Sequence, residues 1–167
     1  MITTHQAEVT LPSDREVKVS RSFNAPVALV YRAHTEPALV KRWMLGPPGW
    51  TMPVCEMDVR VGGKYRWRWR ADEGGAEFGF HGEFTGVEPN ERLVHTERFD
   101  PGTVGGEHSG GEALITTVFS AADGVTTVTT MMDFGSQESR DRAVATGMTT
   151  GMEQSFQQLD TLLAEID

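Results

Sequence analysis

The stretch SQESRDRAVATGMTTGMEQSFQQLDTLLAEID decides the fold of this chain; it runs from Ser136 to Asp167 without a proline. Apolar side chains recur in it every three or four residues, the spacing that keeps one face of an α-helix apolar. We expect one continuous helix of about 40 Å, at about 1.5 Å per residue, and such a helix needs a broad apolar surface to pack against. The apolar stripe consists of Val144, Met148, Met152, Phe156, Leu159, Leu163 and Ile166.

Two glycines interrupt this stripe. Gly147 and Gly151 lie on or beside the apolar face, and each costs a helix about 1 kcal/mol relative to alanine. One interpretation is close packing of the helix on a sheet, or a kink at the glycine. The other is that the absent side chains leave room for a ligand.

Length and charge bound the class of protein. The 167 residues suffice for one domain with a real hydrophobic core. A net charge of -9, from 24 acidic and 15 basic residues, opposes nonspecific attraction to nucleic acid or to an anionic membrane. We therefore expect small or neutral partners, and neither nucleic acid nor a membrane.

Targeting signals and cysteine content indicate a cytoplasmic protein. The first residues lack the basic start and apolar run of a signal peptide, and no window approaches the roughly eighteen apolar residues that a membrane span needs. The single cysteine, Cys55, excludes an internal disulfide and suits a reducing compartment. We expect its side chain to be a small buried apolar group.

Hydrophobic periodicity predicts a mixed α+β domain. Residues 1–14 are polar and aperiodic, so we expect a loose tail that at most adds an edge strand. Arg15–Phe23 alternates as a first strand, and Pro26 and Pro37 then begin two short helices. From Pro53 to Asp133 the period is two, which predicts six strands. The expected order is strand, two short helices, six strands and the C-terminal helix.

The run KYRWRWR at residues 64–70 alternates strictly. Its aromatic residues Tyr65, Trp67 and Trp69 share one face, and its cations share the other. Cations interleaved with tryptophans are also found in nucleic-acid sites, but on opposite faces of a strand they cannot form one stacking groove. We expect a solvated outer face for the cations; the alternatives are an acidic partner, or reversed faces with the cations turned inward.

Two turns fix the expected register of the later strands. The tetrapeptide at 88–91 would set Val87 against Arg92, and the Asp-Gly pair at 123–124 is a strong type I′ hairpin signal. The pairs that follow from these turns are Phe84–His95, Phe80–Phe99, Ile115–Met132, Thr117–Thr130 and Phe119–Val128.

Four segments together resemble a known family: KRWMLGPPGW, DVRVGGKYRWRWR, FHGEFTGVEPNERLVHTERF and GMEQSFQQLDTLLAEI. They resemble the family named for the activator of the 90-kDa heat-shock protein ATPase (Aha-like), within the START-like, or SRPBCC, superfamily. The resemblance covers residues 15–167 as a single domain. It implies an α+β helix-grip fold, in which a curved antiparallel sheet of about six to seven strands surrounds the long C-terminal helix. Two short helices follow the first strand, and a cavity lies between sheet and helix.

The residues expected to face inward form the candidate ligand site. Ligand sites are mostly apolar, with a few polar groups that fix orientation. The same side chains would also suit a core without a cavity, so both outcomes stay open. The candidate ligand-binding residues are Tyr65, Trp67, Trp69, Phe80, Phe84, His95, Glu97, Thr117, Phe119, Thr130, Met132, Met148, Met152 and Phe156.

His95 and Glu97 are the candidate catalytic pair. They lie two apart on one strand, hence on one face and roughly 6 to 7 Å apart at the backbone. An imidazole beside a carboxylate would act as a general base with an orienting acid. The alternative is a hydrogen-bonded pair at the surface or rim. The other histidines lack ligand spacing and the sequence has no phosphate- or dinucleotide-binding motif, so we expect neither metal nor cofactor.

Three functions are consistent with these patterns. The leading hypothesis is non-enzymatic binding of a small hydrophobic molecule between sheet and helix. The second is a polyketide cyclase-like or hydrolase-type enzyme, with His95 and Glu97 as acid and base. The third is a co-chaperone-like ATPase activator that acts through protein–protein contact; chaperone-stimulating members of the family carry a separate N-terminal domain, whereas fourteen residues precede the first strand here. The sequence identifies neither the ligand nor an oligomeric state.

Overall fold

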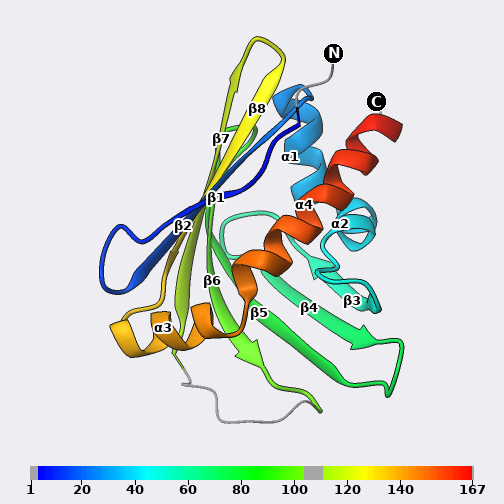
Figure 1. Cartoon of the computed structure of the whole chain (residues 1–167). Coiled ribbons are helices and arrows are strands. Elements are labelled where there is room, and N and C mark those ends of the chain that lie inside the picture. The colour runs from blue at the N-terminus through cyan, green and yellow to red at the C-terminus, as the bar shows by residue number, and fades with distance from the viewer. Residues whose placement is uncertain (1–3, 104–110, 167) are drawn as a thin grey trace.

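A computed structural model describes residues 4–103 and 111–166 of the chain. Its elements follow the predicted order, with one further strand and one further helix (Figure 1). The strands are β1 (Glu8–Thr10), β2 (Glu16–Phe23), β3 (Trp50–Met57), β4 (Lys64–Ala71), β5 (Glu77–Glu88), β6 (Arg92–Asp100), β7 (Ala113–Ala122) and β8 (Val125–Asp133). The helices are α1 (Val27–Thr35), α2 (Pro37–Trp43), α3 (Gln137–Ala145) and α4 (Met148–Glu165).

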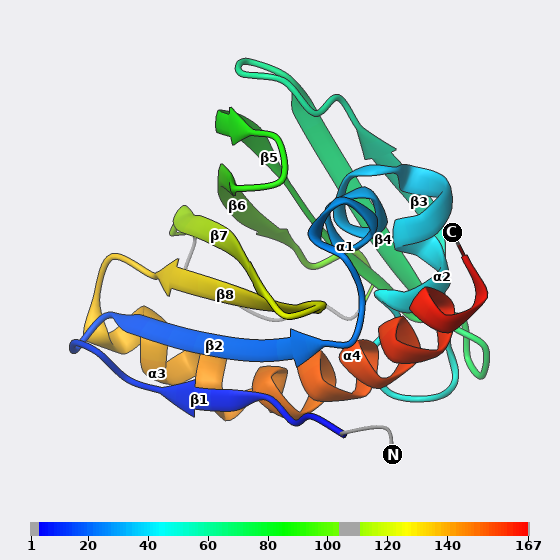
Figure 2. The same cartoon turned by 90° about the horizontal axis from the view of Figure 1, so that it is seen from above.

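All the described strands form one open antiparallel sheet, in the order β1-β2-β8-β7-β6-β5-β4-β3. The sheet curves round α1, α2 and α4, which lie on its concave side (Figures 1 and 2). This is the helix-grip fold that the resemblance implied, with 8 strands in place of about six to seven. The additional strand is β1, which lies within residues 1–14 and pairs with β2.

The prediction of one continuous C-terminal helix is wrong. The chain forms α3 and then α4, and the break falls at Gly147, whose φ of +82° lies in the left-handed region that glycine adopts without a steric penalty. Ser136 caps α3, because its Oγ accepts a hydrogen bond from the Ser139 N–H at 3.1 Å. The kink interpretation therefore explains Gly147, and Val144 lies on the exposed side of α3.

The predicted strand pairs are confirmed, with one local correction. The β7–β8 hairpin pairs Phe119 with Val128, and both residues of its Asp-Gly turn have positive φ. Phe84 lies opposite His95 as expected. Val87, however, pairs with Leu93 rather than with Arg92, because a bulge after Phe84 shifts the register by one residue.

The buried core has two parts. The first, here called the α4 cluster, joins β2, β7 and β8 to α1 and α4, and includes Phe23, Ile115 and Leu159. The second, the α2 cluster, joins β3, β4 and β5 to α2, and includes Val40 and Met52. The sheet therefore carries its helices on two separate apolar surfaces.

An arginine fastens α4 to the sheet. Arg21 points inward from β2 and is 1% exposed. Its guanidinium donates to Glu153 at 3.2 Å, to Asp160 at 2.6 and 2.9 Å, and to the Ser22 carbonyl at 2.8 Å. Because Glu153 and Asp160 lie two turns apart on α4, this one side chain fixes both the position and the rotation of the helix.

Candidate ligand-binding site

The part of the concave face over β4, β5 and β6 is not covered by α4. Helix α4 lies close to β2, α1, α2 and α3 and stands farther from these three strands. Its middle is tied to the α2–β3 loop: Ser155 Oγ accepts from the Gly46 N–H at 2.8 Å, and Gln158 donates to the Gly46 carbonyl at 3.2 Å. One turn earlier, a Cβ at Gly151 would meet no heavy atom within 4 Å. Helix and loop therefore diverge towards the start of α4.

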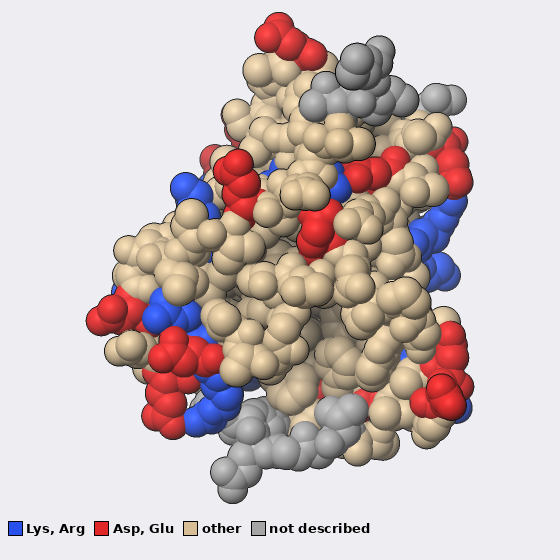
Figure 3. All heavy atoms as spheres, viewed as in Figure 1, with Lys and Arg blue, Asp and Glu red and all other residues tan. Residues whose placement is uncertain are grey.

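This divergence is visible at the molecular surface. Figure 3 shows a hollow below the middle of the molecule, between the start of α4 and strands β4 and β5, and its visible atoms belong mostly to uncharged residues. Met148 and Met152, at the start of α4, are only partly buried. Close packing, one of the two explanations for the glycines, does not apply at Gly151.

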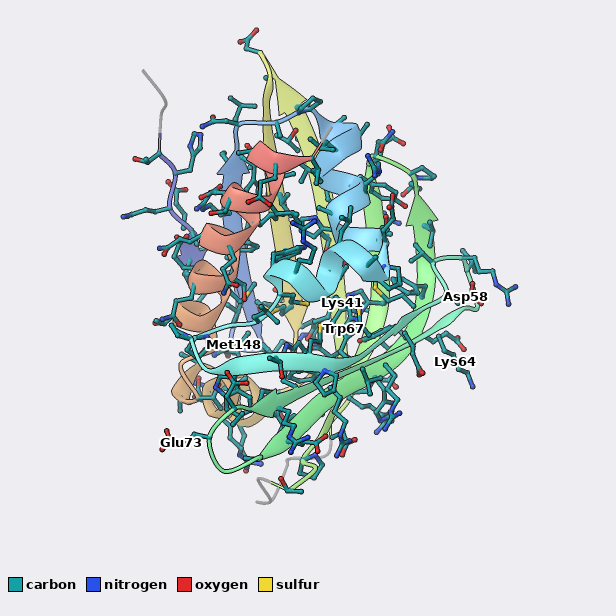
Figure 4. The ribbon with its side chains drawn as sticks, turned by 90° about the vertical axis from the view of Figure 1, so that its right-hand side faces the viewer. Lys41, Asp58, Lys64, Trp67, Glu73 and Met148 are labelled. Carbon is teal, nitrogen blue, oxygen red and sulfur yellow. The ribbon has the colours of Figure 1, made fainter. Side chains whose placement is uncertain are left out.

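The sheet side of this space is a wall of aromatic rings. Strict alternation in β4 turns Tyr65, Trp67 and Trp69 inward, and their exposed fractions are 2%, 9% and 8%. Figure 4 shows Trp67 on the helix side of β4, below α2, whereas Lys64 lies at the far end of the strand. The ring centroids of Tyr65 and Trp67 lie 4.4 Å apart. Phe84 from β5 is fully buried behind them.

Two further aromatic residues belong to this wall and were absent from the sequence-based set. Phe78 stacks on Trp69, with ring centroids 5.5 Å apart. Phe99 lies 5.5 Å from Phe80. The alternating pattern contained the signal for both, because Phe78 shares its face with Phe80 and Phe99 shares its face with Glu97.

Three residues predicted for the wall belong to the α4 cluster and not to the face over β4, β5 and β6: Phe119, Met132 and Phe156. Phe156 packs edge-on against Phe23 at 5.5 Å and stacks on Trp43 at 6.1 Å. Phe119 packs edge-on against an aromatic ring of α1. Met132 is 4% exposed in the same cluster. These side chains pack between the helices and the sheet and do not belong to the aromatic wall.

Polar side chains of β6, β7 and β8 point inward among these apolar surfaces. Thr117 is buried, and its cross-strand neighbour Thr130 is partly buried. His95 and Glu97 lie on the concave side of β6, as the sequence predicts, opposite Ile115 and Ala113 of β7. The structure thus places polar groups on an otherwise apolar face.

A hydrogen-bonded group of Tyr65, His95 and Thr96 joins β4 to β6. Tyr65 Oη donates to the Thr96 carbonyl at 2.6 Å, and His95 Nδ1 lies 3.0 Å from that hydroxyl and 3.2 Å from that carbonyl. Gly82 lies between the two strands, and a Cβ there would lie 2.9 Å from the Tyr65 ring and 2.0 Å from the Thr96 carbonyl. Only glycine therefore lets the tyrosine ring cross β5 to reach β6.

This arrangement fixes the tautomer of His95. A carbonyl oxygen can only accept, so Nδ1 carries the proton and Nε2 presents its lone pair. Burial lowers the pKa of His95 to about 4, so the ring is neutral at pH 7. Burial, together with the charge of Glu97, also raises the pKa of the Tyr65 hydroxyl.

Glu97 is a partly buried carboxyl with no hydrogen-bond partner in the described part of the chain. Burial raises its pKa to about 7. No hydrogen bond joins it to His95 among the described residues, so the two side chains share a face without forming a dyad. Their arrangement offers a titrating carboxyl beside a weakly basic imidazole.

Trp67 carries a second unpaired polar group. Its indole Nε1 is buried and has no hydrogen-bond partner within residues 4–103 and 111–166. The indoles of Trp43 and Trp69, by contrast, donate to the Ala33 and Met44 carbonyls at 2.8 and 2.6 Å. A buried donor without an acceptor is rare in proteins and calls for an explanation.

The cations of β4 lie on the outer face, as predicted. Arg68, the most covered of them, pairs with Glu77 at 2.9 Å and with Asp100 at 2.8 Å. Its neighbours Arg66 and Arg70 are exposed. These charges take no part in the concave site.

Other titratable groups have structural surroundings. His34 is held by the Val30 carbonyl at 2.8 Å and packs against Trp43, and burial lowers its pKa to about 4. Cys55 is half-buried, more exposed than expected, beside a shallow hollow of about 350 Å³ between α2 and β3. Burial raises the pKa of its thiol to about 11.

No three His, Cys, Asp or Glu side chains in the described part of the chain are grouped so that they would hold a metal ion. None of the described helices has both the length and the apolar character needed to cross a bilayer.

A family model described as "Activator of Hsp90 ATPase homolog 1-like protein" matches residues 24–164. A structure from Rhodobacter sphaeroides is 27% identical with a TM-score of 0.85, and the match covers 97% of this chain and 100% of that one. One from Chromobacterium violaceum is also 27% identical, with a TM-score of 0.73 over 88% and 96% of the two chains.

A more distant structure shares the fold alone. CalU16 from Micromonospora echinospora is 17% identical with a TM-score of 0.60, over 98% of this chain and 87% of that one. No curated protein matches the sequence.

Proposed function

Since the chain belongs to the Activator of Hsp90 ATPase homolog 1-like family, with its START-like (SRPBCC) fold, we propose that it binds a small hydrophobic molecule between the sheet and the start of α4. The observation that carries this proposal is the open space beside Gly151, together with the hollow between the start of α4 and strands β4 and β5 in Figure 3. Met148 and Met152 pack against the α4 cluster and stay partly buried at the start of α4, so they would supply an adaptable apolar lining on the helix side.

Simple binding fits the surrounding groups better than turnover. A general base works best when its pKa lies near the working pH, whereas the pKa of His95 is lowered to about 4 by burial. Its Nδ1 is also committed to Tyr65 and Thr96. The protein therefore offers a rigid polar anchor within an apolar surface, which suits recognition.

An enzymatic alternative rests on Glu97. Its pKa of about 7, raised by burial, suits a general acid or base, and it lies on the concave face with His95. Turnover of a bound molecule that stops on Glu97→Gln and continues on His95→Gln would favour this alternative. Unchanged binding without product formation would favour the simple binding protein.

A co-chaperone role is the third candidate, and family membership is what supports it. It would use the exposed surface and not the concave site. Stimulation of the chaperone ATPase by the wild type, retained when the space beside Gly151 is filled, would support this role.

The test of ligand binding fills the proposed space. Gly151→Leu adds a side chain where nothing lies within 4 Å, and it removes a helix-destabilising glycine, so the variant should be about as stable as the wild type or more so. We expect it to weaken binding of 2-methylnaphthalene at least tenfold, as measured by quenching of tryptophan fluorescence.

Thr150→Leu is the matched control, because Thr150 is the preceding residue of α4 and is exposed. It should leave binding unchanged. Equal binding by the wild type and both variants would place the ligand elsewhere, and no binding by the wild type would overturn the proposed function.

A further inference from the structure

Three polar groups on the concave face lack a protein partner in the described part of the chain. Trp67 Nε1 is buried and unpaired. His95 uses Nδ1 on Tyr65 and Thr96, and its Nε2 has no hydrogen-bond partner among the described residues. The Glu97 carboxyl is likewise without a hydrogen bond. Elsewhere on the same face, the guanidinium of Arg21 is fully paired, so the deficit is local.

The first two groups belong to one contiguous set of rings. The centroids of Trp67 and His95 lie 6.0 Å apart, and Tyr65 contacts both, at 4.4 and 4.9 Å. Their chemistry is complementary, since an indole N–H can only donate and the free Nε2 of this histidine tautomer can only accept.

A hydroxyl group can accept one hydrogen bond and donate another, so a single group has the chemistry to pair both partners. Resting on the proposed function, we propose that the bound molecule is a neutral hydrophobic alcohol or phenol, whose oxygen accepts from Trp67 Nε1 and whose proton is donated to His95 Nε2. The aromatic wall then holds its apolar body. Neither the donor nor the acceptor remains unpaired in the complex.

Other ligand classes fit the polar groups less well. A hydrocarbon leaves the buried indole donor and the imidazole acceptor unpaired, and a ketone pairs only the donor. A carboxylate would bring negative oxygens against the lone pair of His95 and the carboxyl of Glu97. The site should therefore prefer hydroxyl over carbonyl, and both over carboxylate.

Three naphthalenes of similar size test this order at pH 8: 2-naphthol, 2-methylnaphthalene and 2-naphthoate. We expect 2-naphthol to bind about tenfold more tightly than 2-methylnaphthalene, the effect of about one well-made buried hydrogen bond, and 2-naphthoate to bind most weakly. Isothermal calorimetry measures all three affinities on the same protein.

Trp67→Phe is the decisive variant. It keeps an aromatic ring and loses no intramolecular hydrogen bond, because the indole N–H has no protein partner. The naphthol-to-methylnaphthalene affinity ratio should fall close to one. Trp43→Phe is the control, because that indole lies outside the aromatic wall and already donates to the Ala33 carbonyl; stability should fall while the ratio stays near ten.

Glu97→Gln gives an independent measurement that leaves the rings intact. It should raise the affinity for 2-naphthoate severalfold at pH 8. A ratio near one in the wild type, or a ratio that Trp67→Phe leaves unchanged, would overturn the hydroxyl site while leaving the proposed function standing. If none of the three compounds bound the wild type, both would fall together.

Discussion

The two ends of the concave face treat buried polar groups in opposite ways. At the β2 end, Arg21 is 1% exposed, yet every nitrogen of its guanidinium has a partner, from two residues of α4 and from its own strand. At the β4–β6 end, Trp67 Nε1 and the Glu97 carboxyl have no partner among the described residues. One buried cation is thus fully paired, whereas a buried indole N–H and a partly buried carboxyl on the same face lack a partner in the described part of the chain.

This difference separates the groups that fix helix α4 on the sheet from the groups that we assign to the proposed ligand. Buried polar groups that are fully paired make a helix position unique, whereas unpaired ones destabilise the fold unless a ligand pairs them. The β2 end fixes the grip of α4 on the sheet. The unpaired polar groups at the β4–β6 end are the ones that the proposed ligand would pair.

The largest expected effect comes from removing the fully paired arginine at the β2 end. Arg21→Met removes the cation and leaves Glu153 and Asp160 facing an apolar surface. Loss of one partner from a buried ion pair costs about 3 to 5 kcal/mol, and because Asp160 is 43% exposed we expect about 3 kcal/mol, the lower end of that range. Urea unfolding, followed by circular dichroism, measures the change.

Arg142→Met is the matched control on α3, since Arg142 pairs with Glu138 in an exposed i,i+4 contact. It should cost about 0.3 to 0.5 kcal/mol. A loss of under 1 kcal/mol for Arg21→Met would mean that α4 is held chiefly by its apolar face.

The next largest effect comes from the unpaired end and depends on pH. Burial raises the pKa of Glu97 from its ordinary 4.5 to about 7, so the unfolded chain releases this proton before the folded protein does. The folded state therefore loses stability as pH rises from 4.5 to 7, and the loss is complete above pH 7. Glu97→Gln removes it and should gain about 2 kcal/mol at pH 8, allowing for partial exposure, and nothing at pH 4.

Thermal unfolding of both proteins across this range isolates the effect of Glu97. The pKa values of His34 and His95, lowered by burial to about 4, change stability in the opposite direction, since stability falls as pH falls from 6.5 to 4. That contribution is common to both proteins and cancels in their difference. Glu91→Gln, in the exposed β5–β6 turn, is the matched control for the loss of one acidic side chain, and a parallel pair of curves for Glu97→Gln and the wild type would refute the prediction.

The paired end was the harder one to foresee from sequence. Alternation in β2 puts Arg21 on the inner face with Val19 and Phe23, but its partners lie 132 and 139 residues away, a distance that no local pattern spans. The bulge after Phe84 was also missed, because its one-residue register shift leaves no mark in the alternation.

The aromatic wall was predictable because its signals are local. Strict alternation placed Tyr65, Trp67 and Trp69 inward, and the Asp-Gly turn set the β7–β8 register. What alternation cannot show is whether an inward polar atom finds a partner. The unpaired indole of Trp67 therefore emerged only from the three-dimensional structure.

The smallest expected effects come from Gly147 and Gly151, at the start of α4. Their substitutions should change the free energy of unfolding in opposite directions. Gly147 has a φ of +82° and ends α3, so Gly147→Ala forces a left-handed alanine and should cost about 1 kcal/mol. Gly151 lies inside α4 beside open space, so Gly151→Ala should gain about 1 kcal/mol. Urea unfolding of the pair measures both. If Gly151→Ala lost stability instead, other side chains would fill the space beside Gly151, and the start of α4 would be packed as closely as the β2 end.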